Sequence, residues 1–455
     1  MAHVRNHPSE GPAVSFLEKT FQLRERGTSV RTEVLAGATT FLTMAYIVLV
    51  NPSILGTTGM PVAGVAAATC LAAGVGCLLM GFLANYPIAL APGMGLNAYF
   101  AFTVVGAMGV PWQTALGLVF ISGVLFIVLT VAGVRQLIVS AIPRALFSAI
   151  AAGIGLFIAF IGLRGSGLVV GNPATLVTLG DVHAPATLLA LLGLAILSVL
   201  LVLKVRGAIF IGIVATAVLG WVLGLATWAP QPYSLDEMTG TALKLDIPAA
   251  LGIGGHGFGL ALLEILFVFL FVDLFDNVGT LVAVSKKAGL MRPDGSIPRL
   301  NRILFADAGA TVVGSLAGTS TVVSYIESAS GVSAGGRTGL TAVVTGLLFL
   351  ATLFVAPWAQ VIPAAATAPA LILVGAMMMG PLTEIDWDDP VVAIPAFLTL
   401  VTIPLTFSIA NGLAFGVIAY AVLKLASRRV AKADWLLFAL AALFIARFVY
   451  MAVEG

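Results

Sequence analysis

The sequence predicts an all-α integral membrane protein, and two observations carry that prediction. Of the 455 residues, 60% are hydrophobic and only 9% are charged, whereas a soluble domain has about 25% charged residues. From Val34 to Val134 the chain contains no Asp, Glu, Lys or Arg. Apolar runs of this length suit helices of about 20 residues that cross a bilayer. The net charge of +2 gives no reason to expect nucleic acid as a partner.

The apolar runs predict 14 transmembrane spans in two sets of seven. The first set covers residues 33–50, 61–84, 86–106, 112–133, 141–162, 184–203 and 207–226. The second covers residues 259–284, 299–317, 319–335, 338–356, 364–380, 390–407 and 410–427. A further apolar stretch, 434–450, fits either an extra span or a helix on the membrane surface. The tail, residues 1–32, lacks the short apolar core of a removable signal peptide, so we expect the first span to direct insertion.

Basic residues gather at one end of the predicted spans and therefore orient the chain. They precede span one or follow spans four, six, eight, ten and fourteen: Lys19, Arg24, Arg26, Arg31, Arg135, Arg144, Lys204, Arg206, Lys286, Lys287, Arg292, Arg299, Arg337, Arg428, Arg429 and Lys432. Because loops rich in Lys and Arg stay inside, we expect a cytoplasmic N-terminus in a multi-pass protein of the plasma (inner) membrane. Arg164 does not fit this pattern.

The two sets of spans also resemble each other, which indicates an internal repeat. The matched segments are Ser122–Phe126 with Thr345–Phe349, Ile142-Pro143 with Ile362-Pro363, and Gly212–Leu219 with Gly416–Leu423. Because seven is odd, the second copy starts on the opposite side of the membrane. The sequence therefore predicts a 7+7 inverted repeat, which is a common plan of secondary transporters.

Spans three and ten are predicted to be broken, each into a short extended segment and a half-helix. Two prolines and two glycines between Tyr86 and Gly95 are incompatible with a regular helix. Thr319–Ser324 consists of β-branched and hydroxyl residues, which favour an extended segment with a helix after it. Inverted symmetry then pairs the two segments antiparallel and aims both half-helix N-termini at one point. The alternative is a Pro-kinked helix and a Ser/Thr-rich packing face.

Five carboxylates lie inside or against the apolar spans: Glu264, Asp273, Asp276, Asp307 and Glu327. A charged group at the bilayer centre costs about 2.5–3.5 kcal/mol, so such groups mark a substrate or proton pathway. Asp273 and Asp276 share one helix face, and their span contains no Lys or Arg. A buried carboxylate without a cation needs strong hydrogen bonds or a proton, so both are candidate proton carriers. The alternative is a carboxyl group that only holds helices together.

The other three acids differ in how strongly they point to a site. Glu327 falls in the first turn of the half-helix of span ten and is expected to face the cavity. Asn97 occupies the equivalent place in span three, where its amide offers a donor and an acceptor. Asp307 is expected to pair with Arg302 or to cap a helix. Glu264 lies near the outer end of span eight, where we expect it to meet water.

The remaining signals argue against an enzyme. His3, His7, His183 and His256 are dispersed and have no metal-ligand spacing. There is no nucleophile–base motif, and no metal or other cofactor is expected. Cys70 and Cys77, seven residues apart on one predicted helix, are too far apart for a disulfide and are expected to be small packing residues.

Four motifs of the chain resemble those of the AzgA-like purine permeases, a branch of the nucleobase–cation symporter-2 superfamily. They are Ala91-Pro-Gly-Met-Gly-Leu-Asn-Ala-Tyr-Phe100, Phe271-Val-Asp-Leu-Phe-Asp-Asn-Val-Gly-Thr280, Ala306-Asp-Ala-Gly-Ala310 and Thr319–Val332. The resemblance extends from about residue 15 to 430. It implies 14 spans divided into a core domain (spans 1–4 and 8–11, residues 33–135 and 259–357) and a gate domain (spans 5–7 and 12–14, residues 136–227 and 358–428).

The resemblance also implies the activity and its residues. The family imports adenine, guanine or hypoxanthine together with a proton (sodium is less expected), by alternating access and usually as a homodimer. The substrate-binding positions correspond to Asn97, Asp273, Asp276, Thr280, Tyr325, Ile326, Glu327 and Ser328, with Asp273 and Asp276 as the proton-coupling pair. In the uracil and xanthine branches a Glu and a His replace Asp276 and Thr280, so the residues here favour the purine branch.

Three other functions remain as alternatives. A uracil or xanthine permease of the same superfamily shares the overall pattern. An inorganic-anion transporter of the same fold needs an electropositive site, and the predicted site has several acids and no buried cation. A channel is disfavoured because broken spans and an inverted repeat are typical of alternating access.

Overall fold

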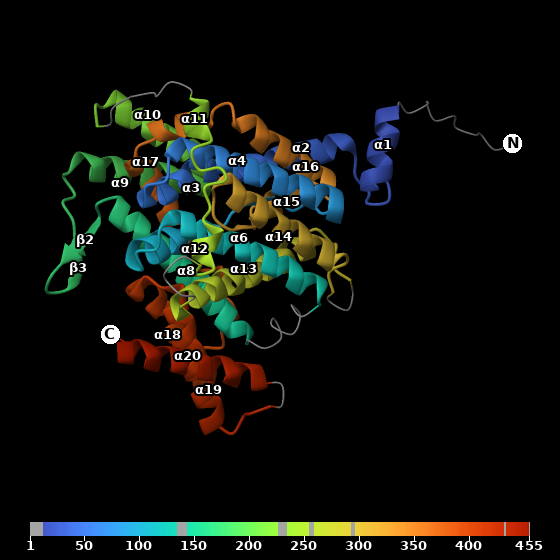
Figure 1. The fold of residues 1–455 in the computed structure, drawn as a ribbon. Helices are drawn as coiled ribbons and strands as arrows, with labels where there is room; N and C mark the ends of the chain where they lie inside the picture. Colours follow the sequence, from blue (N-terminus) through green and yellow to red (C-terminus); the bar gives the residue numbers. More distant parts are fainter. Residues whose placement is uncertain are drawn as a thin grey trace.

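The computed structural model describes residues 12–133, 143–225, 234–253, 259–292, 296–431 and 434–454. Residues 1–11, Arg135, His256 and Lys432, which entered the sequence analysis, lie outside these ranges. Within them, eight helices are long and apolar enough to cross a membrane. The fold is mostly helical, and the chain is a multi-pass membrane protein (Figure 1).

The described part of the first half of the chain contains ten α-helices, two π-helical segments and one short 3-10 turn. Their bounds are α1 Pro12–Phe21, α2 Val30–Met44, α3 Ile47–Leu55, η1 Gly56–Thr58, α4 Val62–Leu79, η2 Met80–Ala84, α5 Met94–Ala98, η3 Tyr99–Ala107, α6 Trp112–Val131, α8 Arg144–Gly165, α9 Pro185–Val202, α10 Ala208–Val222 and α11 Leu235–Met238. Three strands lie among them: β1 Leu90–Pro92, β2 Val169–Asn172 and β3 Leu176–Leu179.

The second half continues with nine α-helices of the described ranges and one strand. These are α12 Ile247–Ala250, α13 Leu260–Lys287, α14 Leu300–Ala317, β4 Val322–Ser324, α15 Ser328–Ser333, α16 Gly339–Thr352, α17 Ala364–Met377, α18 Pro390–Thr406, α19 Ile409–Ala426 and α20 Trp435–Glu454. Two 3-10 segments, η4 Ala356–Val361 and η5 Gly380–Glu384, connect them.

Local sequence explains where several helices begin. Ser29, Ser408 and Asp389 each accept a hydrogen bond from a backbone N–H in the first turn of α2, α19 and α18, which satisfies a donor that the helix leaves free. Proline occupies the first turn of α9 and α18, where its missing N–H costs nothing.

Strands β1 and β4 form a two-stranded antiparallel sheet in the interior. Leu90 pairs with Ser324 and Pro92 with Val322, and both strands are buried. The pairing continues on both sides, because Gly93 N–H donates to the Thr321 carbonyl at 2.9 Å and Tyr325 N–H to the Ala89 carbonyl at 3.0 Å. Each strand is followed by a short helix, α5 or α15. Because the strands are antiparallel, the two helices begin at opposite ends of this short sheet.

The longer helices pack in two groups. In the first, α14 packs on α4 and α6, α16 packs on α2 and α4, and α13 packs on α6, β4 and α15. In the second, α8 packs on α17 and α18, α19 on α18, and α9 on α10 and α17. Figure 1 shows α18 and α19 at one edge of the molecule, away from α2, α4 and α16.

Glycines allow helices within each group to approach closely. If Gly339 of α16 carried a Cβ, that atom would lie 2.2 Å from the carbonyl oxygen of Gly81 in η2. A Cβ at Gly375 of α17 would lie 2.3 Å from the carbonyl oxygen of Gly155 in α8. Neither position admits a side chain without movement. Small residues at such crossings are typical of helices that pack in lipid.

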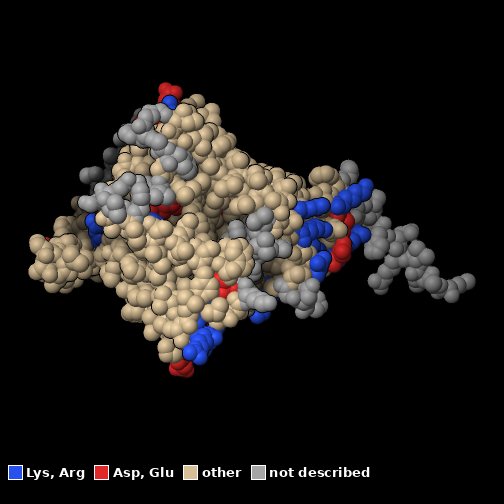
Figure 2. Space-filling view, turned by 60° about the horizontal axis from the view of Figure 1, so that its bottom comes forward, with Lys and Arg blue, Asp and Glu red and all other residues tan. Residues whose placement is uncertain are grey.

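The two ends of the molecule differ in charge. Figure 2 shows that Lys and Arg side chains gather at the end where α1 lies. The opposite end carries the hairpin β2–β3, in which Val169 pairs with Leu179 and Asn172 with Leu176. The uneven distribution of Lys and Arg is the feature from which a cytoplasmic N-terminus is predicted.

Candidate functional site

Glu327 lies where β4 gives way to α15, at the centre of the candidate site. It directly precedes the first residue of α15, and its Oε1 accepts a hydrogen bond from the hydroxyl of Tyr46 at 2.7 Å. Tyr46 lies in the junction between α2 and α3 and is buried. The Glu327 side chain is partly exposed. One side of this carboxylate is therefore fixed by the protein while the group stays accessible.

Asp276 supplies a second carboxylate to the same region. Its side chain is exposed and makes no hydrogen bond or ion pair with another described residue. It interacts electrostatically with Glu327 and Tyr325. One turn further along α13 there is open space beside Gly279, because a Cβ added there would have no atom within 4 Å. Two acids thus act on each other beside open space, and no cation of the described residues neutralises Asp276.

Asp273 and Asp307 are held in a different way, through Asn277. The amide nitrogen of Asn277 donates to Asp273 Oδ1 at 2.9 Å and to Asp307 Oδ2 at 2.6 Å, while its oxygen accepts from Ser324 N–H at 2.8 Å. All three side chains are buried. The expected pairing of Asp307 with Arg302 is wrong, because Arg302 is exposed on the surface whereas Asp307 joins α14 to α13. The network fixes strand β4 on both helices.

The other predicted site residues surround the strand pair. Asn97 of α5 is buried; its oxygen accepts from the Ser320 hydroxyl, while its amide nitrogen has no partner among the described residues. Ile326 is 48% exposed and lies next to Glu327. Thr280 is buried on α13. The structure thus leaves a buried donor on Asn97 and an accessible apolar side chain on Ile326.

Two predicted residues use their hydroxyls to hold the strands. The Tyr325 hydroxyl donates to the Pro92 carbonyl at 2.5 Å, and the Ser328 hydroxyl accepts from Ala89 N–H at 3.0 Å. Both bonds join the β4 segment to the β1 segment. Because both hydroxyls already have partners, their role near a ligand is to hold the two strands in place.

Sequence reasoning missed two residues of this region. Tyr46 holds Glu327, and Asn277 links both aspartates to β4. Asn277 had a readable signal, since it directly follows Asp276 within an apolar span. Tyr46 is separated from Glu327 by 281 residues, and its partner depends on the packing of α2 and α3 against α15.

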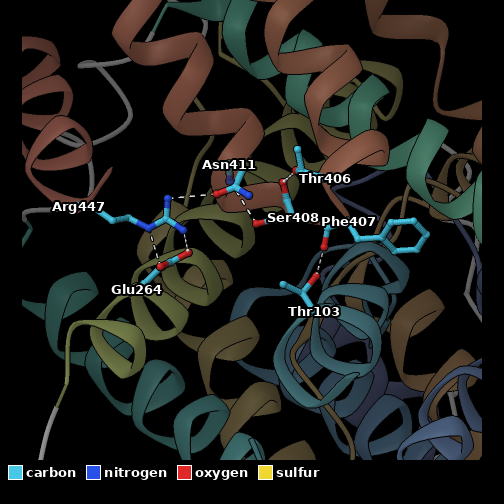
Figure 3. Close-up of polar contacts among 7 residues, drawn as sticks. All are labelled: Thr103, Glu264, Thr406, Phe407, Ser408, Asn411 and Arg447. Carbon is cyan, nitrogen blue, oxygen red and sulfur yellow. Dashed lines mark hydrogen bonds and ion pairs between the residues drawn. The ribbon is translucent and has the colours of Figure 1, made fainter. Parts of the chain in front are cut away.

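The expectation that Glu264 meets water is wrong. Its two carboxylate oxygens accept hydrogen bonds from Nε and Nη2 of Arg447 in α20, both at 2.6 Å. The side chains of Glu264 and Arg447 are 14% and 13% exposed. Figure 3 shows this pair beside Asn411 of α19. The apolar stretch at the C-terminus supplies a cation that sequence spacing could not assign to α13.

The arrangement suits a neutral polar ligand better than a metal or an anion. Among the residues that the structure describes, no group of three or more His, Cys, Asp or Glu could hold a metal ion. Glu327 and Asp276 offer carboxylate oxygens as acceptors, and the buried groups without a described partner include the Asn97 amide and the hydroxyls of Thr321 and Ser324. Cys70 and Cys77 are buried and free, as expected.

The chain is similar to proteins of a known family over most of its length. Residues 31–415 match the model of the permease family. A putative permease of Methanocaldococcus jannaschii is 51% identical over 96% of this chain and 99% of its own length. The adenine permease AdeP of Escherichia coli is 43% identical over 99% of both chains. The guanine/hypoxanthine permease PbuG of Bacillus subtilis is 45% identical over 95% of this chain and 99% of its own.

Solved structures share the fold at low sequence identity. The transmembrane domain of a cyanobacterial bicarbonate transporter, BicA, aligns with a TM-score of 0.61 over 90% of this chain and 97% of its own, at 16% identity. Murine SLC26A9, an anion transporter in the inward-facing state, aligns with a TM-score of 0.61 over 94% of this chain and 74% of its own, at 12% identity. These likenesses concern the fold alone. The family match and the relatives at 43–51% identity, together with the motifs of α13 and the β4 segment, show that the chain is a permease, not an enzyme, and belongs to the AzgA-like branch of the nucleobase–cation symporter-2 superfamily.

Proposed function

We propose that this protein imports purine nucleobases (adenine, guanine and hypoxanthine) by proton symport and alternating access. The observation that carries the proposal is the pair of accessible carboxylates, Glu327 and Asp276, beside the β1–β4 sheet. Relatives at 43% and 45% identity are named for adenine and for guanine/hypoxanthine transport. The proposed substrate class therefore rests on the names of these relatives, and the site must be able to bind such a base.

The site offers groups that match the edge of a purine. A purine is flat and has N–H donors and N or O acceptors around its rim. Glu327, held by Tyr46, accepts from ring N–H groups, and the free amide nitrogen of Asn97 donates to a ring nitrogen or oxygen. Ile326 provides an accessible apolar surface for the ring. Polar groups that a ligand must satisfy make a site selective, because an unpaired buried partner is costly.

Asp276 is the better placed of the two proposed proton carriers. It is accessible and lacks a hydrogen-bond partner among the described residues, whereas Asp273 is bonded to Asn277. Its repulsion with Glu327 favours a state in which one of the two acids holds a proton. One charge crossing the membrane gains about 2.3 kcal/mol per 100 mV, so a bound proton lets a neutral base be concentrated. Sodium is the less favoured ion.

We further propose 14 core and gate spans in a 7+7 inverted repeat, with spans three and ten broken at β1 and β4. Two contacts between equivalent positions support this arrangement. Strand β1 pairs with β4, and Gly155 packs on Gly375, which follows it by 220 residues (375 − 155), the same offset as from Ile142-Pro143 to Ile362-Pro363 (362 − 142). The first packing group corresponds to the core domain (33–135 and 259–357) and the second to the gate domain (136–227 and 358–428). A cytoplasmic N-terminus, an inner-membrane location and a homodimer complete the proposal.

The exposed face of α13 suggests which way the site opens. Asp276, Gly279, Ala283 and Lys286 are exposed and follow one another at helical spacing. They lead from the site toward the end of α13 that carries Lys286 and Lys287. By the positive-inside rule this is the cytoplasmic end, so we assign an inward-facing arrangement.

The main rival function is inorganic-anion transport, since BicA and SLC26A9 have the same fold. An anion site requires positive charge near the ligand, and here the accessible charges are negative. A uracil or xanthine permease is a second rival. Those branches have a Glu and a His at the positions that Asp276 and Thr280 occupy in this chain.

Uptake by cells that express the full chain tests the proposal. Labelled adenine is supplied with an excess of unlabelled adenine, guanine, hypoxanthine, uracil, xanthine, bicarbonate or sulfate, at two external pH values. We expect saturable uptake that purines inhibit, that is weaker at the higher pH and that a protonophore abolishes. Preferred transport of uracil, bicarbonate or sulfate contradicts the proposed substrate, and dependence on sodium alone contradicts proton coupling.

A further inference from the structure

Helix α20 follows the last predicted span and runs antiparallel to α19. Asp434, just before α20, pairs with Lys424 in the last turn of α19 at 2.5 Å. Arg447, near the far end of α20, donates to Asn411 in the first turn of α19 at 3.1 Å. The two contacts are separated by 13 residues along α19 (424 − 411) and by 13 residues along α20 (447 − 434), which corresponds to about 20 Å of helix. Helix α20 therefore extends along most of the length of α19.

The same helix also contacts the other packing group. Arg447 forms its two hydrogen bonds of 2.6 Å with Glu264 of α13, and the ring of Phe444 meets that of Phe267 at 5.8 Å in an edge-on arrangement. Arg447 thus joins α13, in the proposed core domain, to α19, in the proposed gate domain. The Asp434–Lys424 pair at the opposite end of α20 stays within the gate side.

A second contact between the two groups lies nearby. The Thr103 hydroxyl, in η3, donates to the carbonyl of Phe407, between α18 and α19. The ring of Phe407 packs edge-on against Phe157 and Phe160 of α8, each at 5.4 Å. Figure 3 shows Thr103, Phe407, Ser408, Asn411, Arg447 and Glu264 in one region. Figure 1 shows that α20 ends on the side of the hairpin β2–β3, opposite α1.

The two ends of α13 therefore differ in their contacts with the gate side. The end that contains Glu264 is tied to α19 and α20, whereas Asp276, Gly279 and Ala283 toward the other end are exposed. If the site faces the cytoplasm, the tied end is the outer one. In that case the contacts at this end join core and gate on the outer side of the site.

We propose that Arg447 is a positioning residue of the transport cycle, and that α20 crosses the membrane as an additional span in order to present it. In the inward-facing arrangement Arg447 holds Glu264 and Asn411 together and closes the outer side between core and gate. When the site faces outward, the Glu264–Arg447 bond breaks and Arg447 stays with α19. The proposal rests on alternating access as the proposed function and adds a residue that the family match, which ends at residue 415, does not include.

Loss of the pair shifts the balance between the two arrangements. A contact made in one state stabilises that state only, so Arg447→Gln or Glu264→Gln favours the outward-facing state. The apparent affinity for a ligand rises with the fraction of protein that is competent to bind it. External adenine should then show a lower KM together with a lower maximal rate. A general folding defect does not lower KM.

The test measures the accessibility of Ala283→Cys in inverted membrane vesicles, with buried Cys70 and Cys77 as an unreactive background. A membrane-impermeant maleimide labels this cysteine from the cytoplasmic side. We expect Arg447→Gln and Glu264→Gln to slow labelling at least about fivefold, in the usual range of coupling between two states. Asp434→Asn is the matched control, since it breaks a bond of α20 that does not reach α13, and its labelling rate should match that of the parent.

The double reversal Glu264→Arg with Arg447→Glu separates pairing from folding. We expect each single reversal to slow labelling and the double reversal to restore it. Unchanged labelling in Arg447→Gln, or equal slowing in Asp434→Asn, overturns the proposal, as does a double reversal that inserts normally without restoring the rate. If Arg447→Gln fails to insert, the double reversal and Arg447→Lys decide in its place. Failure of the parent protein to transport purines refutes the proposed function instead, and leaves the labelling result to stand by itself.

Discussion

Glu264 and Asp276 lie 12 residues apart (276 − 264) on one helix, α13, about 18 Å along its axis, and their surroundings are opposite. Glu264 has a bidentate Arg447 and is mostly buried. Asp276 is exposed, has no described cation beside it and faces a second acid, Glu327. Both acids carry the same cost of lying in an apolar helix, and the protein offsets it in different ways.

The difference separates two uses of a carboxylate in a membrane protein. A paired carboxylate joins helices, and breaking such a pair by removing one partner is costly because a charge is left behind. A carboxylate without a cation must be hydrogen-bonded or protonated, and it therefore responds to ligands and to proton supply. We expect substitutions at Glu264 to alter the balance of states, and those at Asp276 and Glu327 to alter binding and coupling.

The largest effect is expected at Glu327. Glu327→Ala removes the acceptor and should abolish purine binding, while Glu327→Gln replaces one acceptor oxygen by a donor and should weaken binding at least about tenfold, since a hydrogen bond to a charged group contributes about 1.5–3 kcal/mol. Binding of labelled adenine to purified protein measures both. Glu384→Gln, at the periphery in η5, is the control. Unchanged affinity of Glu327→Gln for every purine places the site elsewhere.

Asp276→Asn comes next, because it removes the proposed proton carrier and leaves Glu327 in place. Accumulation of adenine against a gradient should be lost, while exchange of internal for external adenine continues in part. The remaining exchange should no longer depend on external pH. Counterflow in proteoliposomes measures exchange separately from accumulation. Full accumulation by the Asp273→Asn, Asp276→Asn double variant removes both residues from the coupling role.

A smaller effect is expected from Tyr46→Phe. This change removes one hydrogen bond to Glu327 (2.7 Å) and keeps the ring, so the carboxylate remains but is less well oriented. Affinity for adenine should fall about fivefold, which corresponds to about 1 kcal/mol. Tyr86→Phe removes a hydroxyl that bonds the Pro298 carbonyl and provides a control outside the site. Equal effects of the two substitutions mean that Tyr46 does not orient Glu327.

The smallest effect is expected at a carboxylate outside the spans, Asp389. The Val391 backbone N–H, and then the Arg429 guanidinium, lower the pKa of Asp389 below its usual range. A lowered pKa stabilises the fold above the usual pKa of about 3.9, and that stabilisation is lost as the pH falls through the lowered value. Asp389→Asn keeps the helix cap but not the ion pair. Its melting temperature should be slightly lower than that of the parent at pH 7, and equal in acid or in high salt. A difference that persists in acid shows that the ion pair is not its cause.

Sequence reasoning predicted which residues come together better than it predicted the partners of each residue. Asp276, Glu327 and Asn97 were predicted from apolar periodicity and from helix-breaking residues, and the structure brings all three to the β1–β4 region. The pairing of Asp307 with Asn277 instead of Arg302, and of Glu264 with Arg447, was not predicted. Each depends on which helices pack together, and apolar helices carry little information about their neighbours because many packings bury similar surface.

The sequence by itself determined that the chain is a helical membrane protein, because a long stretch without charge and repeated apolar runs have few other solutions. It also identified the charged residues inside apolar spans, which are too costly in free energy to be kept there without a function. Only the tertiary structure decided the partners and the burial of each one. Glu264 and Asp276 are chemically alike and lie on one helix. The difference between them is that α20 brings Arg447 to Glu264, whereas no cation of the described residues pairs with Asp276.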